Sequence, residues 1–246
     1  MRKTRAARPI PLALTALVAC FSALAALAVS GGMNMAQAHG NQPSASMSMP
    51  MAMSMSTTVA HTAPALSQRS VTLHDDLRQL WEEHVTWTRL AIISLEGSTP
   101  DAKATVARLL RNQVDLGNAI KPYYGVAAGN ELTRELKSHI LIAADVIAAA
   151  KAGDKAKLAS AQARWVKNAN QIAAFLHHAN PSHWPLAELT NEMHMHLQLT
   201  TDEAVAHLQG KWSADVADYD RVEQHILHMS DLLADGIVAQ FPSRFS

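Results

Sequence analysis

The fold is decided by the stretch from Thr72 to Gly97, which reads TLHDDLRQLWEEHVTWTRLAIISLEG. Thr72 is a residue type that caps helices, and the acids Asp75 and Asp76 fall in the first turn, where the helix dipole favours negative charge. Gly97 follows the last apolar residue and is typical of a helix end. The stretch therefore predicts a helix over residues 72–96. The residues that we expect to face the core recur every three or four positions, at Leu77, Trp81, His84, Thr88, Ile92 and Leu95.

The same helical period continues along the rest of the chain. Glycine, proline and polar residues divide it into further helices over about 99–121, 126–152, 154–179, 186–198, 200–210 and 213–241. Alternation of β-branched residues is scarce, so no strand is expected. We expect an all-α fold, an antiparallel helical bundle of four long helices plus two shorter helices, over residues 70–246.

A polar residue interrupts the apolar stripe near the middle of each of the four long helices: His84, Gln113, His139 and Asn168. At about 1.5 Å per residue, His84 and His139 lie roughly 18–20 Å along their helices, and Asn168 lies at a similar height. An unpaired buried polar group costs about 1–3 kcal/mol. We therefore expect these side chains to meet each other, a water molecule or an ion.

Two further histidines are candidates for this layer. His225 reaches the same height if the helix over 213–241 runs parallel to the first helix. His196 shares a helix face with Met193, whereas His194, two residues away, must point elsewhere.

These four histidines, His84, His139, His196 and His225, form a candidate metal site. An imidazole-rich site without thiols suits copper, zinc, nickel or iron. The Glu-x-x-His spacing of di-iron bundles is missing, and so are glycine-rich phosphate loops, G-x-S-x-G and His-Glu-x-x-His. A metal-binding protein, a metalloenzyme with an open coordination position and a metal-free hydrogen-bonded layer all stay open.

The first 38 residues are typical of a secretory signal peptide. Four basic residues precede an apolar run from Ile10 to about Ser30, and Ala36-Gln37-Ala38 is a pattern that signal peptidase cleaves. Lipidation at Cys20 and an uncleaved membrane anchor are alternatives, and both would tether the protein to a membrane. All three place the remainder in the periplasm or otherwise outside the cytoplasm.

Residues 39–69 form a low-complexity tail that we expect to be disordered. Methionine recurs at every second position, so in an extended chain the thioethers lie on one side. Thioether sulfur suits Cu(I). After cleavage at Ala38, the α-amine and imidazole of His39 could together chelate Cu(II). The tail ligands are thus His39, Met47, Met49, Met51, Met53 and Met55.

Charge and cysteine content exclude several classes of protein. Lys+Arg and Asp+Glu both number 21, so the net charge is zero, which argues against a nucleic-acid binder. The single cysteine, Cys20, lies in the apolar leader. A chain cleaved at Ala38 has no disulfide and no cysteine-based metal or catalytic site.

Four blocks of the chain resemble small bacterial helical-bundle proteins of unassigned function, which are often labelled acetylglutamate kinase or glycosyltransferase. The resemblance spans about residues 73–241 and implies a helical fold, with histidines at His84, His139 and His196. The chain lacks the α/β pattern that those two activities require. The blocks are Leu80–Arg89, Arg108–Gln113, Trp165–Ala169 and Gly236–Phe241.

Together these patterns favour an exported copper-binding bundle that serves metal buffering, tolerance or delivery. The tail would capture Cu(I), and the histidine layer would hold a second ion. A metalloenzyme and a metal-free helical interaction module are the alternatives.

Overall fold

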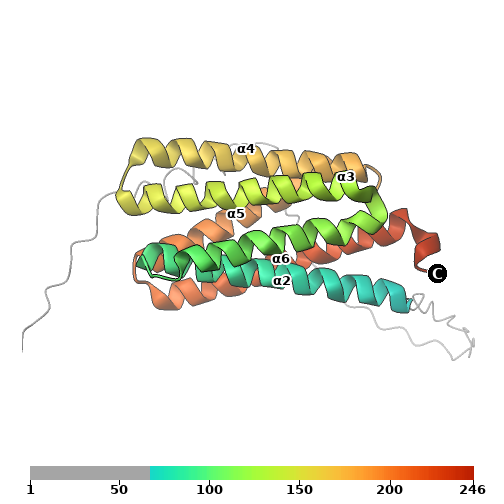
Figure 1. Cartoon of the computed structure of the whole chain (residues 1–246), viewed down its shortest axis with the longest axis horizontal. Coiled ribbons are helices and arrows are strands. Elements are labelled where there is room, and N and C mark those ends of the chain that lie inside the picture. Colours follow the sequence, from blue (N-terminus) through green and yellow to red (C-terminus); the bar gives the residue numbers. More distant parts are fainter. Residues whose placement is uncertain (1–66) are drawn as a thin grey trace, which may run out of the picture.

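The computed structural model describes residues 67–246, which form five α-helices and a short 3-10 turn (Figure 1). This part of the chain contains no strand, which confirms the all-α prediction. None of the described helices is both long and apolar enough to span a membrane. The elements are α2 (Gln68–Gly97), α3 (Ala102–Ala152), α4 (Lys155–Ala179), α5 (Leu186–Leu208), α6 (Trp212–Gln240) and η1 (Pro242–Arg244).

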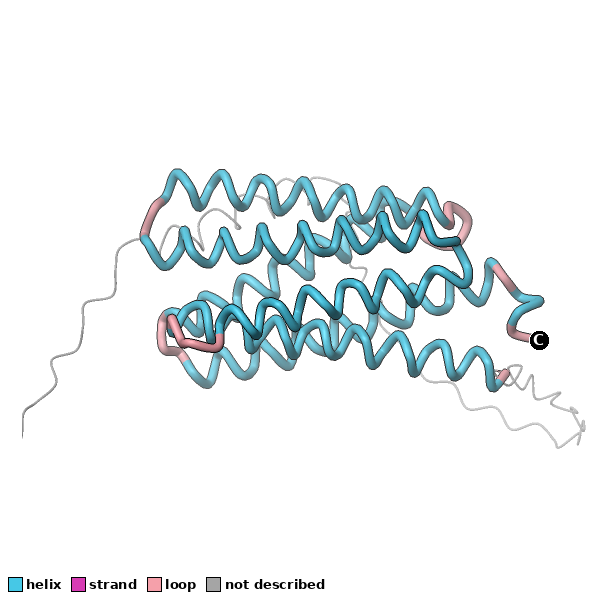
Figure 2. The backbone as a smooth tube through the Cα atoms, in the orientation of Figure 1, coloured by secondary structure: helices cyan, strands magenta, loops and turns pink. Residues whose placement is uncertain are grey.

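The long helix α3 consists of two limbs that fold back on each other (Figure 2). Pro122 lies within it, and Gly125 has a φ of 85°, a left-handed conformation that glycine adopts most readily. The limbs then touch through Gly117 and Gly129, where an added Cβ would lie 2.4 Å from the facing carbonyl oxygen. The predicted boundary between helices 99–121 and 126–152 is therefore confirmed as this sharp break.

The helices form a closed ring around the core. In this ring α3 packs on α4, α4 on α5, α5 on α6, α6 on α2, and α2 on α3. Ion pairs of Arg78 with Asp231 and of Arg89 with Asp215 show that α2 and α6 are antiparallel. The parallel orientation considered for the helix over 213–241 is therefore wrong. His225 still lies at mid-height, because it is near the middle of α6.

The prediction of two separate short helices over 186–198 and 200–210 is wrong, because α5 runs unbroken through Thr200 and Thr201. Both hydroxyls donate to carbonyl oxygens one turn earlier, at 2.8 and 2.7 Å, instead of capping a new helix. Thr72 behaves in the same way inside α2, which begins earlier, behind the cap Ser67. Residues 68 and 69 of the predicted tail thus belong to α2.

Several predictions lie outside the described residues. They are the signal peptide over 1–38 with its alternatives at Cys20, and residues 39–66 of the tail, with His39, Met47, Met49, Met51, Met53 and Met55.

Candidate metal centre

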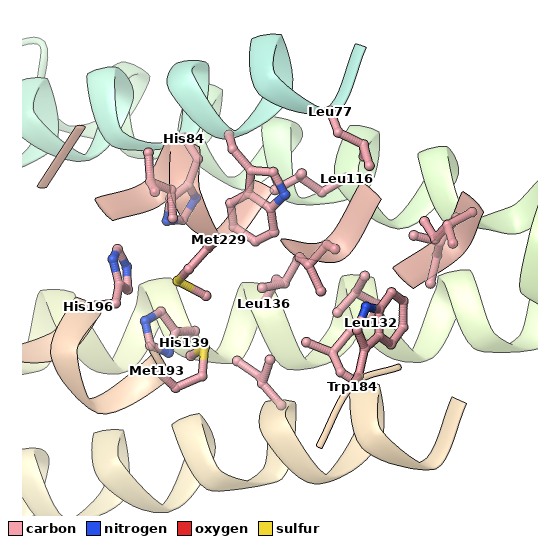
Figure 3. Close-up of a pocket in the computed structure, with 17 residues that line it drawn as sticks. Leu77, His84, Leu116, Leu132, Leu136, His139, Trp184, Met193, His196 and Met229 are labelled. Carbon is pink, nitrogen blue, oxygen red and sulfur yellow. The ribbon is translucent and has the colours of Figure 1, made fainter. Parts of the chain in front are cut away.

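A narrow cavity of about 40 Å³ lies inside the helical ring (Figure 3). Most of its wall is formed by leucine, isoleucine, methionine and tryptophan side chains, and three histidines line one end of it. A single water molecule needs about 10–15 Å³ of such space. The cavity can therefore hold an ion or a few waters beside the imidazoles.

The three histidines come from three different helices: His84 from α2, His139 from α3 and His196 from α5. Their residues are only 2–5% exposed. The centroid of the His196 ring lies 5.8 Å from that of His84 and 6.1 Å from that of His139. Figure 3 shows the three rings around a common space. The predicted convergence of these side chains in the core is thus what the structure shows.

Gln113 fixes the ring of His84. Its Nε2 donates to the carbonyl oxygen of Leu109 at 2.8 Å and to Oδ1 of Asn112 at 3.0 Å, and it lies 3.2 Å from Nδ1 of His84. Because this amide nitrogen is a donor, Nδ1 of His84 is the acceptor. The neutral ring of His84 then carries its proton on Nε2, so Nε2 binds a metal ion only when that proton moves to Nδ1 or leaves.

His139 has both ring nitrogens engaged. Its Nδ1–H donates to Oδ1 of Asn168 at 2.9 Å, and its Nε2 accepts from the indole N–H of Trp165 at 3.2 Å. Asn168 is held in turn by Glu135, whose Oε2 accepts from Nδ2 at 3.0 Å. The predicted contacts within the polar layer are confirmed. To bind a metal, His139 would have to give up one of these bonds.

His196 is the least satisfied of the three. Its Nδ1 is buried and has no hydrogen-bond partner. The ring also stacks on the partly buried His225, with centroids 6.2 Å apart and planes 17° apart. A buried imidazole nitrogen without a partner is costly and calls for an explanation, such as a bound water or an ion.

Burial keeps these imidazoles uncharged. It lowers the pKa of His84 to about 3, with further repulsion from His139, and lowers the pKa of His139 to about 4. Burial, followed by repulsion from the neighbouring imidazoles, holds the pKa of His196 well below its usual value. Neutral imidazole is the form that binds metal ions.

Two thioethers line the same cavity, and sequence reasoning did not assign them as ligands. Met193 lies on α5 and Met229 on α6, and Figure 3 places both beside the histidines. The signal was present in the sequence, because Met193 precedes His196 by three residues and Met229 follows His225 by four, which is one helical turn in each case. Imidazole and thioether together are the ligands that copper prefers.

The remaining histidines are placed differently. His225 lies against the outer side of His196, and its Nε2–H donates to the carbonyl oxygen of Glu192 at 3.1 Å. His194 points away from the core, where its Nε2 bonds Oδ1 of Asn170 at 2.7 Å. The choice of His196 over His194 as the inward residue is thus confirmed.

As they stand within residues 67–246, no three His, Cys, Asp or Glu side chains converge closely enough to hold a metal ion. A metal centre at this cavity therefore needs thioether ligands, side-chain rotation, or both. Met229 and Met193 supply the thioethers, and the cavity supplies the space for rotation.

Comparison with known proteins adds no assignment, since no family, curated protein or solved structure matches this chain.

Proposed function

We propose that the protein is exported and binds copper, for buffering, tolerance or delivery of the metal. The bundle holds one ion between His84 and His196, with Met229 and Met193 as thioether ligands. His139 keeps its bonds to Asn168 and Trp165 and so holds the wall of the site in place.

The observation that carries this proposal is the unpartnered Nδ1 of His196, a residue that lines the same cavity as two thioether side chains. A buried imidazole nitrogen without a donor or acceptor is uncommon in native proteins, and a bound ion would satisfy it. Zinc, nickel and iron fit less well, because thioether sulfur is a soft ligand that favours Cu(I).

The methionine tail is the second part of the proposal. Its alternating thioethers capture Cu(I) outside the cytoplasm, where thioethers do not form disulfides. The tail and the bundle are then two separate copper sites in one chain.

The experiment measures how many Cu(I) ions the mature chain binds in competition with a chromophoric Cu(I) chelator. His196→Leu should lose one equivalent, whereas deletion of residues 45–56 should lose the tail equivalents and keep the one in the bundle. His194→Leu is the matched control, because His194 lies on the same helix but faces outward. Unchanged stoichiometry in His196→Leu would contradict a metal site in the bundle and favour a metal-free hydrogen-bonded layer.

A further inference from the structure

A second cavity of about 40 Å³ lies between α2, α3, α4 and α5, and none of His84, His139 and His196 lines it. Aliphatic side chains form most of its wall. Glu96, near the end of α2, is the one ionisable side chain among the described residues that line it. A single water molecule needs about 10–15 Å³ of such space, so the cavity has room for about three water-sized groups.

The carboxyl group of Glu96 has no partner in the described part of the chain. Both of its oxygens are buried, and neither makes a hydrogen bond. Lys151 is the basic residue whose charge acts on Glu96, but its ammonium group bonds the carbonyl oxygen of Leu95 at 2.9 Å and the hydroxyl of Ser98. A buried carboxyl group without a partner is costly and calls for a bound water molecule or an ion.

Without a counter-ion, Glu96 is largely protonated at neutral pH. Burial raises its pKa to about 8, and repulsion from Asp215 on α6 and Glu203 on α5 adds to this effect, whereas Lys151 on α3 opposes it. The carboxyl group therefore keeps a negative charge at neutral pH only when a cation accompanies it.

The other polar residues that line this cavity have no donor to spare. Thr88, Thr200 and Thr201 each donate the hydroxyl hydrogen to a backbone carbonyl oxygen one turn earlier, at 2.7–2.8 Å. The indole N–H of Trp165 is bonded to His139. A water molecule both donates and accepts hydrogen bonds, whereas an ammonium group only donates them. A wall that offers acceptors alone therefore suits an ammonium ion better than water.

We propose that the second cavity binds a small primary ammonium ion, such as methylammonium, whose N–H groups donate to the carboxylate of Glu96. The aliphatic wall contacts the methyl group of the ion, and the charge of the ion balances that of the carboxylate. Binding at neutral pH releases the proton of Glu96 to solvent, so charge is conserved and no bond within the ion breaks. The site is independent of the proposed copper site, because the two share no ligand.

The test looks for methylammonium in this cavity of the metal-free mature protein. Carbon-13-labelled methylammonium chloride is added at about pH 8.5, above the pKa of Glu96. Isotope-filtered NOE spectroscopy should show cross-peaks from the methyl group of the ion to those of Ile92 and Leu208, which line the cavity. Glu96→Gln keeps the size of the side chain, removes its charge and should abolish the cross-peaks. Glu82→Gln is the matched control and should keep them, because Glu82 is an exposed carboxylate on the same helix.

Competition separates this proposal from its alternatives. Unlabelled ammonium chloride should displace the labelled ion, whereas potassium chloride at the same concentration should not. Absence of the cross-peaks in wild-type protein would overturn the site, and their persistence in Glu96→Gln would show that the carboxylate does not hold the ion. Displacement by potassium as complete as that by ammonium would contradict a preference for N–H donors.

Discussion

Replacing His196 with leucine should stabilise the metal-free protein and remove its response to copper. In the metal-free state, the buried Nδ1 of His196 has no hydrogen-bond partner within the protein. Such an atom costs about 1–3 kcal/mol, and an apolar side chain of similar size has no such cost. For a domain of this size, that gain corresponds to about 2–4 °C in Tm for each kcal/mol.

Copper should make the wild-type protein more stable than His196→Leu, the reverse of the order in metal-free protein. A ligand at 100 times its Kd stabilises the folded state by about 2.7 kcal/mol, provided that it does not bind the unfolded chain. Wild-type protein gains this stabilisation from copper bound in the bundle, whereas His196→Leu does not. The variant is therefore the more stable protein in chelator and the less stable one in excess Cu(I).

The assay is urea unfolding followed by far-ultraviolet circular dichroism, once in chelator and once in excess Cu(I), on chains that lack residues 45–56. His194→Leu is the control and should change stability by less than about 0.5 kcal/mol in both conditions, since His194 faces outward. The reasoning is refuted if His196→Leu is less stable than wild type in chelator, because the imidazole would then be satisfied in the fold.

Three further predictions concern stability alone. The three cavity histidines have folded pKa values below the unfolded value, so protonation favours unfolding and stability is lost as the pH falls below about 6.5. At about pH 5.5, His84 and His139 each cost about 1.4 kcal/mol relative to pH 8. Urea melts of metal-free protein that show no pH dependence would contradict the burial of these histidines. Arg89→Met should cost about 3–5 kcal/mol in the same assay, because it leaves the buried carboxylate of Glu203 without a cation and that of Asp215 with His207 alone. A loss below 1 kcal/mol would argue against this ion-pair network. Gly236→Ala should cost about 1–3 kcal/mol, because its Cβ would lie 1.9 Å from the indole nitrogen of Trp184, and a wild-type Tm would show that this contact is looser than described.

Many of the helix boundaries follow from residues that begin or end helices. Asp154 caps α4 as its position predicts, with its side chain accepting from the N–H of Lys157, and Gly153 ends α3 in a left-handed conformation. Threonine caused the errors in helix boundaries, because a hydroxyl that looks like a cap can bond one turn back inside a helix, as Thr200 and Thr201 do. Sequence alone does not decide between these two uses.

The candidate site was predictable where it depends on periodicity. A polar residue on an apolar stripe locates His84, His139 and Asn168 in the core, and helix length gives their common height. The orientation of α6 was not predictable, since a helix at mid-height reaches the layer in either direction. The spacing of Met229 from His225 was a weak signal, because methionine on an apolar stripe is equally expected from ordinary core packing.

The most direct measurement of the central claim is X-ray absorption spectroscopy on the mature chain without residues 45–56, loaded with one equivalent of Cu(I). The account predicts copper bonded to both imidazole nitrogen and thioether sulfur, with the sulfur signal reduced in Met229→Leu and the copper lost in His196→Leu. Copper bonded only to nitrogen or oxygen, or a chain that retains no copper once the tail is removed, would contradict it.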